Sequence, residues 1–265
     1  MNHLTIPKDG QAKINKGGRP VIFVGWAVSR TIKRLTHLLC RVDAAQLARV
    51  PSRGPLILVS NHVNFLDVPV VFTHLQPRPL AGFSKVETWD HPFLGPLFSL
   101  YGAIPLRRGE ADIVALRKGL DALEAGCILG VAPEGTRSGD GCLQRARPGV
   151  VTIALHSGAP VLPMACYGFE VFKRNFTRLR RTDFRVVVGY PFYLNVEGVK
   201  VTRQVRQQIV DEIMYQMAAL LPPAYRGYYS DLEHATETFL RFSDPSQSNL
   251  RRAQEHQGER ESQRK

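Results

Sequence analysis

Cysteine is scarce in this sequence. The chain has four cysteines in 265 residues, and no two of them form a C-x-x-C pair or another spacing typical of metal ligands. They are Cys40, Cys127, Cys142 and Cys166. We therefore expect no metal site and no disulfide framework, and this cysteine usage favours a reducing compartment.

Long apolar runs are also missing. A helix that spans a bilayer needs about 20 predominantly apolar residues. The longest apolar stretch near the start of this chain, residues 21–28, ends at Ser29 and Arg30. The first 20 residues are polar and basic, and they lack the apolar region of a secretory signal. If the protein meets a membrane, we expect it to lie on the surface.

Acidic residues are outnumbered by basic ones. The 35 lysines and arginines against 23 acidic residues give a formal net charge of +12. Such an excess indicates an anionic partner, such as lipid head groups, an acidic carrier protein, a phosphorylated substrate or nucleic acid. No RNP-like, helix-turn-helix or zinc-finger pattern is present, so we expect no nucleic-acid partner.

Strand and helix patterns alternate through residues 46–229. Apolar runs predict strands at residues 55–60, 80–84, 103–106, 127–132, 161–166 and 185–189. Helical periodicity predicts helices at residues 68–75, 112–125 and 151–156, and from Thr202 to Pro222. This alternation indicates the α/β class, as a single domain in which helices flank a mixed, largely parallel sheet.

The two ends differ from this domain. We interpret residues 1–20 as a flexible basic leader and residues 230–265 as a polar, largely disordered tail. Residues 21–45 predict an N-terminal amphipathic helical element, with the helix itself over 21–42, a basic polar face, and Phe23 and Trp26 nearby. That combination is typical of a helix on an anionic membrane surface, although a surface helix packed on its own domain is the alternative.

An N-H-x-x-x-x-D motif begins at Asn61, directly after a predicted strand. His62 and Asp67 would be about 140° apart on one continuous helix, so they meet only if His62 lies in the turn and Asp67 opens the next helix. In that geometry Asp67 accepts a hydrogen bond from Nδ1 of His62 and leaves Nε2 free to act as a base. A helix cap is the alternative interpretation.

A second motif, Glu134-Gly135-Thr136-Arg137-Ser138, follows another predicted strand. Ligands bind at the carboxyl ends of strands in open α/β sheets. Gly135 permits a tight turn, and Arg137 offers a guanidinium fork suited to phosphate. We expect Glu134 to orient its neighbours by hydrogen bonding rather than to act as a second base. A polar surface turn is the alternative.

Two further blocks and a basic cluster complete the pattern. Residues 102–108 place Arg107 and Arg108 at the end of a short strand, and residues 158–163 form a proline-bracketed strand entry. Each of the four blocks has an ordinary structural explanation when it stands alone. Their joint occurrence, in this order and at strand ends, does not. Residues 169–185 interleave phenylalanines with six basic residues, which fits docking of lipid head groups or an acidic carrier protein, or else a solvated loop.

With these four blocks in this order, residues 50–195 resemble the glycerophospholipid acyltransferase family, typified by 1-acylglycerol-3-phosphate acyltransferases. The resemblance implies transfer of a fatty acyl group from acyl-CoA or acyl-carrier-protein to the hydroxyl of lysophosphatidic acid, which forms phosphatidic acid. Another lysophospholipid or a lyso-aminolipid is the alternative acceptor. It also implies no cofactor beyond the acyl donor, and a peripheral position on the cytoplasmic face of a membrane.

The resemblance also implies roles for individual residues. His62 is the general base and Asp67 is its partner. The substrate-binding residues are Lys85, Gly102, Arg108, Glu134, Gly135, Thr136 and Arg137, and Pro160 and Pro163 match the fourth block. The sequence departs from the common pattern at Asn64, where many members have serine, and at Ala132, where an aromatic is common. These departures bear on the identity of the acceptor.

Overall fold

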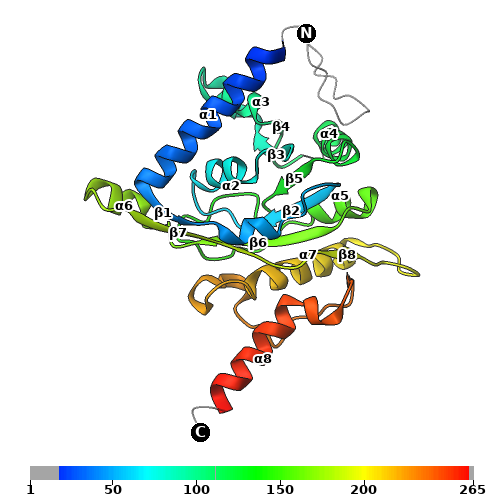
Figure 1. The fold of residues 1–265 in the computed structure, drawn as a ribbon. Coiled ribbons are helices and arrows are strands. Elements are labelled where there is room, and N and C mark those ends of the chain that lie inside the picture. Colours follow the sequence, from blue (N-terminus) through cyan, green and yellow to red (C-terminus); the bar gives the residue numbers. More distant parts are fainter. Residues whose placement is uncertain (1–17, 111, 263–265) are drawn as a thin grey trace.

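A computed structural model describes residues 18–110 and 112–262 of the chain. Within these residues a mixed sheet of nine strands forms the centre of the fold, in the order β1-β7-β6-β2-β5-β3-β4, with β8 and β9 branching from β6 (Figure 1). The strands are β1 (Cys40–Asp43), β2 (Leu56–Ser60), β3 (Leu80–Lys85), β4 (Ala103–Leu106), β5 (Ile128–Val131), β6 (Val161–Tyr167), β7 (Thr182–Val188), β8 (Phe192–Leu194) and β9 (Leu240–Phe242).

Strands β2 to β6 run parallel to one another, so their carboxyl ends lie along one edge of the sheet. Strand β7 is antiparallel to β6, and β1 lies parallel to β7. Strands β8 and β9 extend the sheet by antiparallel pairing. This arrangement confirms the predicted α/β class with a mixed, largely parallel sheet.

Helices connect the strands and cover both faces of the sheet (Figure 1). They are α1 (Gly18–Leu39), α2 (Asp67–Leu75), α3 (Leu94–Leu100), α4 (Ile113–Glu124), α5 (Gly149–Ser157), α6 (Phe172–Thr177), α7 (Arg203–Ala218) and α8 (Asn249–Ser262). Asp112 caps α4 by accepting from Ala115 N–H at 2.9 Å, and Thr202 caps α7 by accepting from Val205 N–H at 3.2 Å. Both helices therefore begin where their sequences predict.

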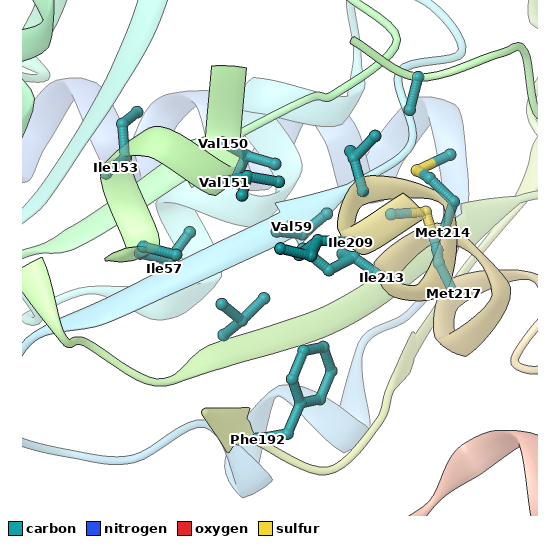
Figure 2. Packing of buried hydrophobic residues seen from close by; sticks show 14 of the residues in the cluster. Ile57, Val59, Val150, Val151, Ile153, Phe192, Ile209, Ile213, Met214 and Met217 are labelled. Carbon is teal, nitrogen blue, oxygen red and sulfur yellow. The ribbon is translucent and has the colours of Figure 1, made fainter. Parts of the chain in front are cut away.

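The central strand β2 is buried on both faces. Leu56 and Leu58 pack into one apolar cluster with α2 and β7. Ile57 and Val59 point the other way, into a cluster with α4, α5 and α7, where Figure 2 shows them beside Val150 and Ile209. A parallel strand that is covered on both faces reads as a continuous apolar run, which is why β2 was recognisable from sequence.

The first helix ends earlier than predicted. The sequence pattern indicates a helix through residue 42, but α1 ends at Leu39 and the next four residues form edge strand β1, parallel to β7. Pairing with β7 satisfies backbone groups that periodicity alone assigns to a helix. Most of the predicted basic leader, residues 1–17, and the side chains of Phe23 and Trp26 lie outside the described residues. Among the described helices, none has the length and apolar character to cross a bilayer.

The C-terminal segment also differs from its prediction. Residues 230–265 read as a largely disordered tail, yet β9 pairs with β8, and Leu250 of α8 is buried. The buried carboxylate of Glu212 on α7 accepts hydrogen bonds from the N–H groups of Thr238 and Phe239. The segment is docked by a few apolar residues scattered through its polar sequence and by the hydrogen bonds that Glu212 of α7 accepts from its backbone. Composition alone does not show this, because α7 is distant in the sequence.

Candidate active site

The predicted site residues lie mainly along the carboxyl edge of the parallel strands. His62 follows the end of β2, Lys85 ends β3, Arg108 comes two residues after β4, and Glu134 follows β5. Because these strands are parallel neighbours, the sheet brings four segments that are far apart in sequence to a common edge. That edge is the usual ligand-binding position in α/β sheets.

His62 and Asp67 form the predicted pair. His62 lies in the turn after β2, and Asp67 is the first residue of α2. Nδ1 of His62 is 2.6 Å from Oδ2 of Asp67, so Nδ1–H donates to the carboxylate and leaves Nε2 as the unprotonated nitrogen. The carboxylate also accepts from Val63 N–H at 2.7 Å. Nε2 makes no hydrogen bond to any described residue, and it is therefore available as a base.

Glu134 joins the first and third sequence blocks. One carboxylate oxygen accepts from the backbone N–H of His62 at 3.1 Å, and the other accepts from Gln144 N–H at 2.9 Å. The side chain is 3% exposed. Burial raises the pKa of the Glu134 carboxyl to about 7, against the opposing effect of the two N–H donors. The Glu134 carboxylate thus holds the backbone of the histidine loop and of Gln144, which agrees with the orienting role that its sequence context predicts.

The turn after Glu134 is bonded to the histidine loop as well. Gly135 has φ +70°, a conformation that favours glycine. Ser138 N–H donates to the His62 carbonyl at 2.8 Å, and Gly139 N–H donates to the Val63 carbonyl at 3.1 Å. The side chains of Thr136 and Arg137 are exposed. The backbone of this turn therefore holds the histidine loop, while Arg137 stays available to a ligand.

Two asparagines fix the histidine loop, and sequence reasoning did not assign either of them this role. The buried amide of Asn61 donates to the Cys166 carbonyl and accepts from Cys166 N–H, both at 2.8 Å. Asn64 donates to the Phe169 carbonyl at 2.9 Å and accepts from Leu66 N–H at 2.9 Å. The Cys166 and Phe169 carbonyls that these asparagines bond lie about a hundred residues away, so no local pattern announces the two contacts. The only sequence signal for the two asparagines was their place in the motif that holds His62.

The cations at this edge are exposed. Lys85, Arg107, Arg108 and Arg137 lie at the same edge of the sheet as His62. Lys85, Arg108 and Arg137 have no charged partner among the described residues, whereas the charge of Arg107 contributes to lowering the pKa of the exposed Asp112 carboxyl. Guanidinium and ammonium groups in this position suit an anionic ligand. In the described part of the chain, no three His, Cys, Asp or Glu side chains gather as metal ligands.

Gly102 is not brought to this edge. It precedes β4 and therefore lies at the opposite end of the strand from Arg108. Its φ is +68°, and a Cβ atom there would lie 2.7 Å from the Leu80 carbonyl oxygen. Gly102 serves the close approach of two chain segments, so its predicted role in substrate binding is not supported by its position. Pro160 and Pro163 are structural, since their carbonyls accept from Ile57 and Gly189 N–H.

Comparison with known proteins finds a family match for nearly half of the chain. Residues 41–167 match the family model described as Acyltransferase, a range that runs from β1 to the end of β6 and includes both motifs. The matched residues include His62, Asp67 and the Glu134 turn.

Several curated proteins are similar to this chain. A 1-acyl-sn-glycerol-3-phosphate acyltransferase of Brassica napus chloroplasts is 30% identical over 158 residues, which cover 58% of this chain and 45% of the relative. A protein of the same name from Bacillus subtilis is 26% identical over 166 residues, covering 62% of this chain and 80% of the relative. A lyso-ornithine lipid O-acyltransferase of Pseudomonas aeruginosa is 32% identical over 114 residues, 43% of each chain. The chain spans about half the length of the plant relatives.

The fold also resembles a solved structure. The crystal structure of the 1-acyl-sn-glycerophosphate acyltransferase PlsC from Thermotoga maritima superposes with a TM-score of 0.52 at 22% identity. The match covers 76% of this chain and 86% of that one. At this identity the likeness supports the arrangement of sheet and helices that is described above.

Proposed function

We propose that this protein transfers a fatty acyl group from a thioester donor to the free hydroxyl of lysophosphatidic acid, and so forms phosphatidic acid. The observation that carries the proposal is the His62–Asp67 pair, with Nε2 of His62 free at a strand edge lined by exposed cations. The family match of residues 41–167 supports the same reaction class.

The reaction moves one proton from the acceptor hydroxyl to the departing thiolate by way of His62, and it needs no enzyme-bound acyl group. Nε2 of His62 takes the proton of the acceptor hydroxyl while the oxygen attacks the thioester carbonyl carbon. The tetrahedral intermediate then expels the thiolate, and the imidazolium returns the proton to that sulfur. Asp67 stabilises the imidazolium through its 2.6 Å contact with Nδ1. Holding the acceptor and the thioester together supplies a large part of the acceleration.

The cations select the acceptor in this proposal. Lys85, Arg107, Arg108 and Arg137 would surround the phosphate of lysophosphatidic acid beside His62. A lyso-aminolipid is the second candidate, because the Pseudomonas aeruginosa relative is named for lyso-ornithine lipid. Acyl-CoA and acyl-carrier-protein are both candidate donors, and no further cofactor is needed.

We further propose that the protein acts at the cytoplasmic face of a membrane as a peripheral protein. Helix α1 packs against α2, yet Leu35 is 51% and Leu38 is 68% exposed. Arg34 lies beside them and is exposed too. An exposed helix that combines apolar and basic side chains fits an anionic bilayer surface.

Acyl transfer assays with a His62→Ala variant test the reaction. Purified protein receives lysophosphatidic acid or lyso-ornithine lipid, with acyl-CoA or acyl-carrier-protein as donor. We expect phosphatidic acid from the wild type and a loss of about a hundredfold or more in His62→Ala. His234→Ala is the matched control, because His234 forms a similar 2.7 Å pair with Asp231 but lies on the exposed surface.

Equal losses in the two histidine variants would contradict the base assignment. Product from lyso-ornithine lipid alone would replace the proposed acceptor by the second candidate. The absence of product with every acceptor and donor, from folded protein, would remove the proposed reaction itself.

A further inference from the structure

The segment after β6 carries a leucine in an unusual conformation. Leu179 has φ +52°, the one positive φ of a non-glycine residue in the described chain, and its side chain is 96% exposed. It ends α6 in a Schellman motif: Arg180 N–H donates to the Asn175 carbonyl at 2.9 Å, and Leu179 N–H donates to the Phe176 carbonyl at 3.1 Å. Glycine is the usual residue at this left-handed position.

Leucine is unfavourable here for two reasons. Its Cβ atom strains the left-handed backbone, and its side chain gains nothing from burial within the chain. Strain that no internal contact offsets is a feature of functional sites. An exposed leucine at the tip of a connection gains free energy only when something outside the chain covers it.

The neighbours of Leu179 extend the apolar surface toward the candidate active site. Phe176 is 53% exposed and its ring lies 5.7 Å from that of Phe172, which in turn lies 5.8 Å from that of Phe65. Phe65 is 51% exposed and belongs to the loop that holds His62. We name Phe65, Phe176 and Leu179, with the cations around them, the α6 patch.

The cations of the α6 patch decide what covers it. Residues 171–182 contain basic residues and no acidic ones. Arg181 is used internally, since it donates to the carbonyls of His37 and Cys40 at the end of α1. The remaining basic side chains are exposed and unpaired within the described residues: Lys173, Arg174, Arg178 and Arg180. Apolar tips among free cations fit an anionic lipid surface.

The structure corrects the sequence interpretation of this cluster. The phenylalanines of residues 169–185 were expected to interleave with the cations at a surface, but Phe169 is fully buried and stacks on Phe184, and Phe172 is also buried. Figure 1 places α6 beside the end of α1, on the side of the sheet where β6 ends.

We infer that the α6 patch docks on an anionic membrane, with Leu179 and Phe176 inserted among the lipid head groups and the four free cations on lipid phosphates. The inference rests on the proposed function in one respect: a lipid acceptor must reach His62 from a bilayer. Docking through Phe65 and α6 sets the histidine loop against that bilayer. The residues of the α6 patch belong to the histidine loop and to the connection between β6 and β7, so this contact differs from the one proposed for α1.

A Leu179→Gly variant tests the docking without threatening the fold. Glycine relieves the backbone strain at φ +52°, so we expect the thermal midpoint of the variant to equal or exceed that of the wild type. Flotation with phosphatidylcholine vesicles that contain phosphatidylglycerol should show about tenfold weaker binding, because a leucine side chain leaves the interface. Binding to pure phosphatidylcholine should be weak for both proteins.

Val199→Gly is the matched control. Val199 is an exposed apolar residue in the connection between β8 and α7. Figure 1 shows β8 and α6 at opposite sides of the molecule. Unchanged vesicle binding in Val199→Gly together with the loss in Leu179→Gly would support the inference. Equal binding of Leu179→Gly and the wild type would overturn it, and so would an equal loss in both variants.

Two further outcomes separate docking from the reaction. Flotation needs no acyl transfer, so weaker binding of Leu179→Gly supports the docking even if the proposed reaction fails. An equal loss of transfer to an acceptor dispersed in detergent would instead place Leu179 in the reaction site and overturn the docking. Weaker binding of acidic acyl-carrier-protein, with vesicle binding intact, would also overturn it.

Discussion

Replacement of Glu134 by glutamine tests how the third sequence block supports the first. The two carboxylate oxygens of Glu134 accept from the backbone N–H groups of His62 and Gln144. Glutamine offers one carbonyl oxygen and turns its NH2 group toward the second donor, so one of the two loops loses its hydrogen bond. Because a displacement of about 1 Å in a reacting group is costly, we expect E134Q to lose about 10- to 100-fold in acyl transfer.

The same side chain also makes the free energy of unfolding depend on pH. Burial raises the pKa of the Glu134 carboxyl from its ordinary value of 4.5 to about 7. Between these values the folded chain keeps a proton that the unfolded chain has lost, so the free energy of unfolding falls as pH rises. At about 1.4 kcal/mol for each pH unit, this one group lowers stability by about 3 kcal/mol over the interval.

Urea denaturation of the wild type and E134Q, at several pH values between about 4.5 and 8, measures this effect. The E134Q variant lacks the titrating group, so its stability should rise relative to the wild type by about 3 kcal/mol across the interval. Glu233→Gln, at an exposed position, should leave the wild-type slope unchanged. Parallel curves for the wild type and E134Q would refute the argument that burial controls this carboxyl.

Three further predictions follow from individual contacts. Asp67→Asn should lower kcat about a thousandfold, because an NH2 group in the place of Oδ2 favours the wrong tautomer of His62; wild-type kinetics would contradict the pair. Arg108→Ala should raise KM for lysophosphatidic acid about tenfold and leave KM for lyso-ornithine lipid nearly unchanged, whereas equal effects on the two would exclude a phosphate contact. Gly227→Ala should lower the free energy of unfolding in urea by about 2 kcal/mol or more, since its Cβ would lie 2.3 Å from the Leu143 carbonyl oxygen; a variant of wild-type stability would show that the loop yields.

The contact between His62 and Asp67 was predictable because its determinants are local. A strand that ends at Ser60 and a helix that begins near Asp67 fix the turn in which His62 meets its carboxylate. The orienting role of Glu134 was predicted from its place after a buried strand, but one of its two donors, the N–H of His62, lies 72 residues away, so only the structure identifies it. Gly102 was assigned to substrate binding by its motif, and a motif match does not say at which edge of the sheet a residue emerges. The structure places Gly102 before β4, at the opposite end of the strand from Arg108.

Alternating apolar runs determined the fold class of this protein, and short motifs at strand ends predicted its family resemblance and the contact between His62 and Asp67. Those features depend on side chains within a few residues of one another, which a sequence displays directly. Only the tertiary structure decided that Asn61 bonds to Cys166, that Glu212 docks the segment holding Phe239, and that Leu179 stands exposed in a left-handed turn. Each of these features depends on segments that are far away along the chain. No local sequence pattern states which distant backbone group will bond to a buried polar side chain, or whether a distant segment will cover an apolar one.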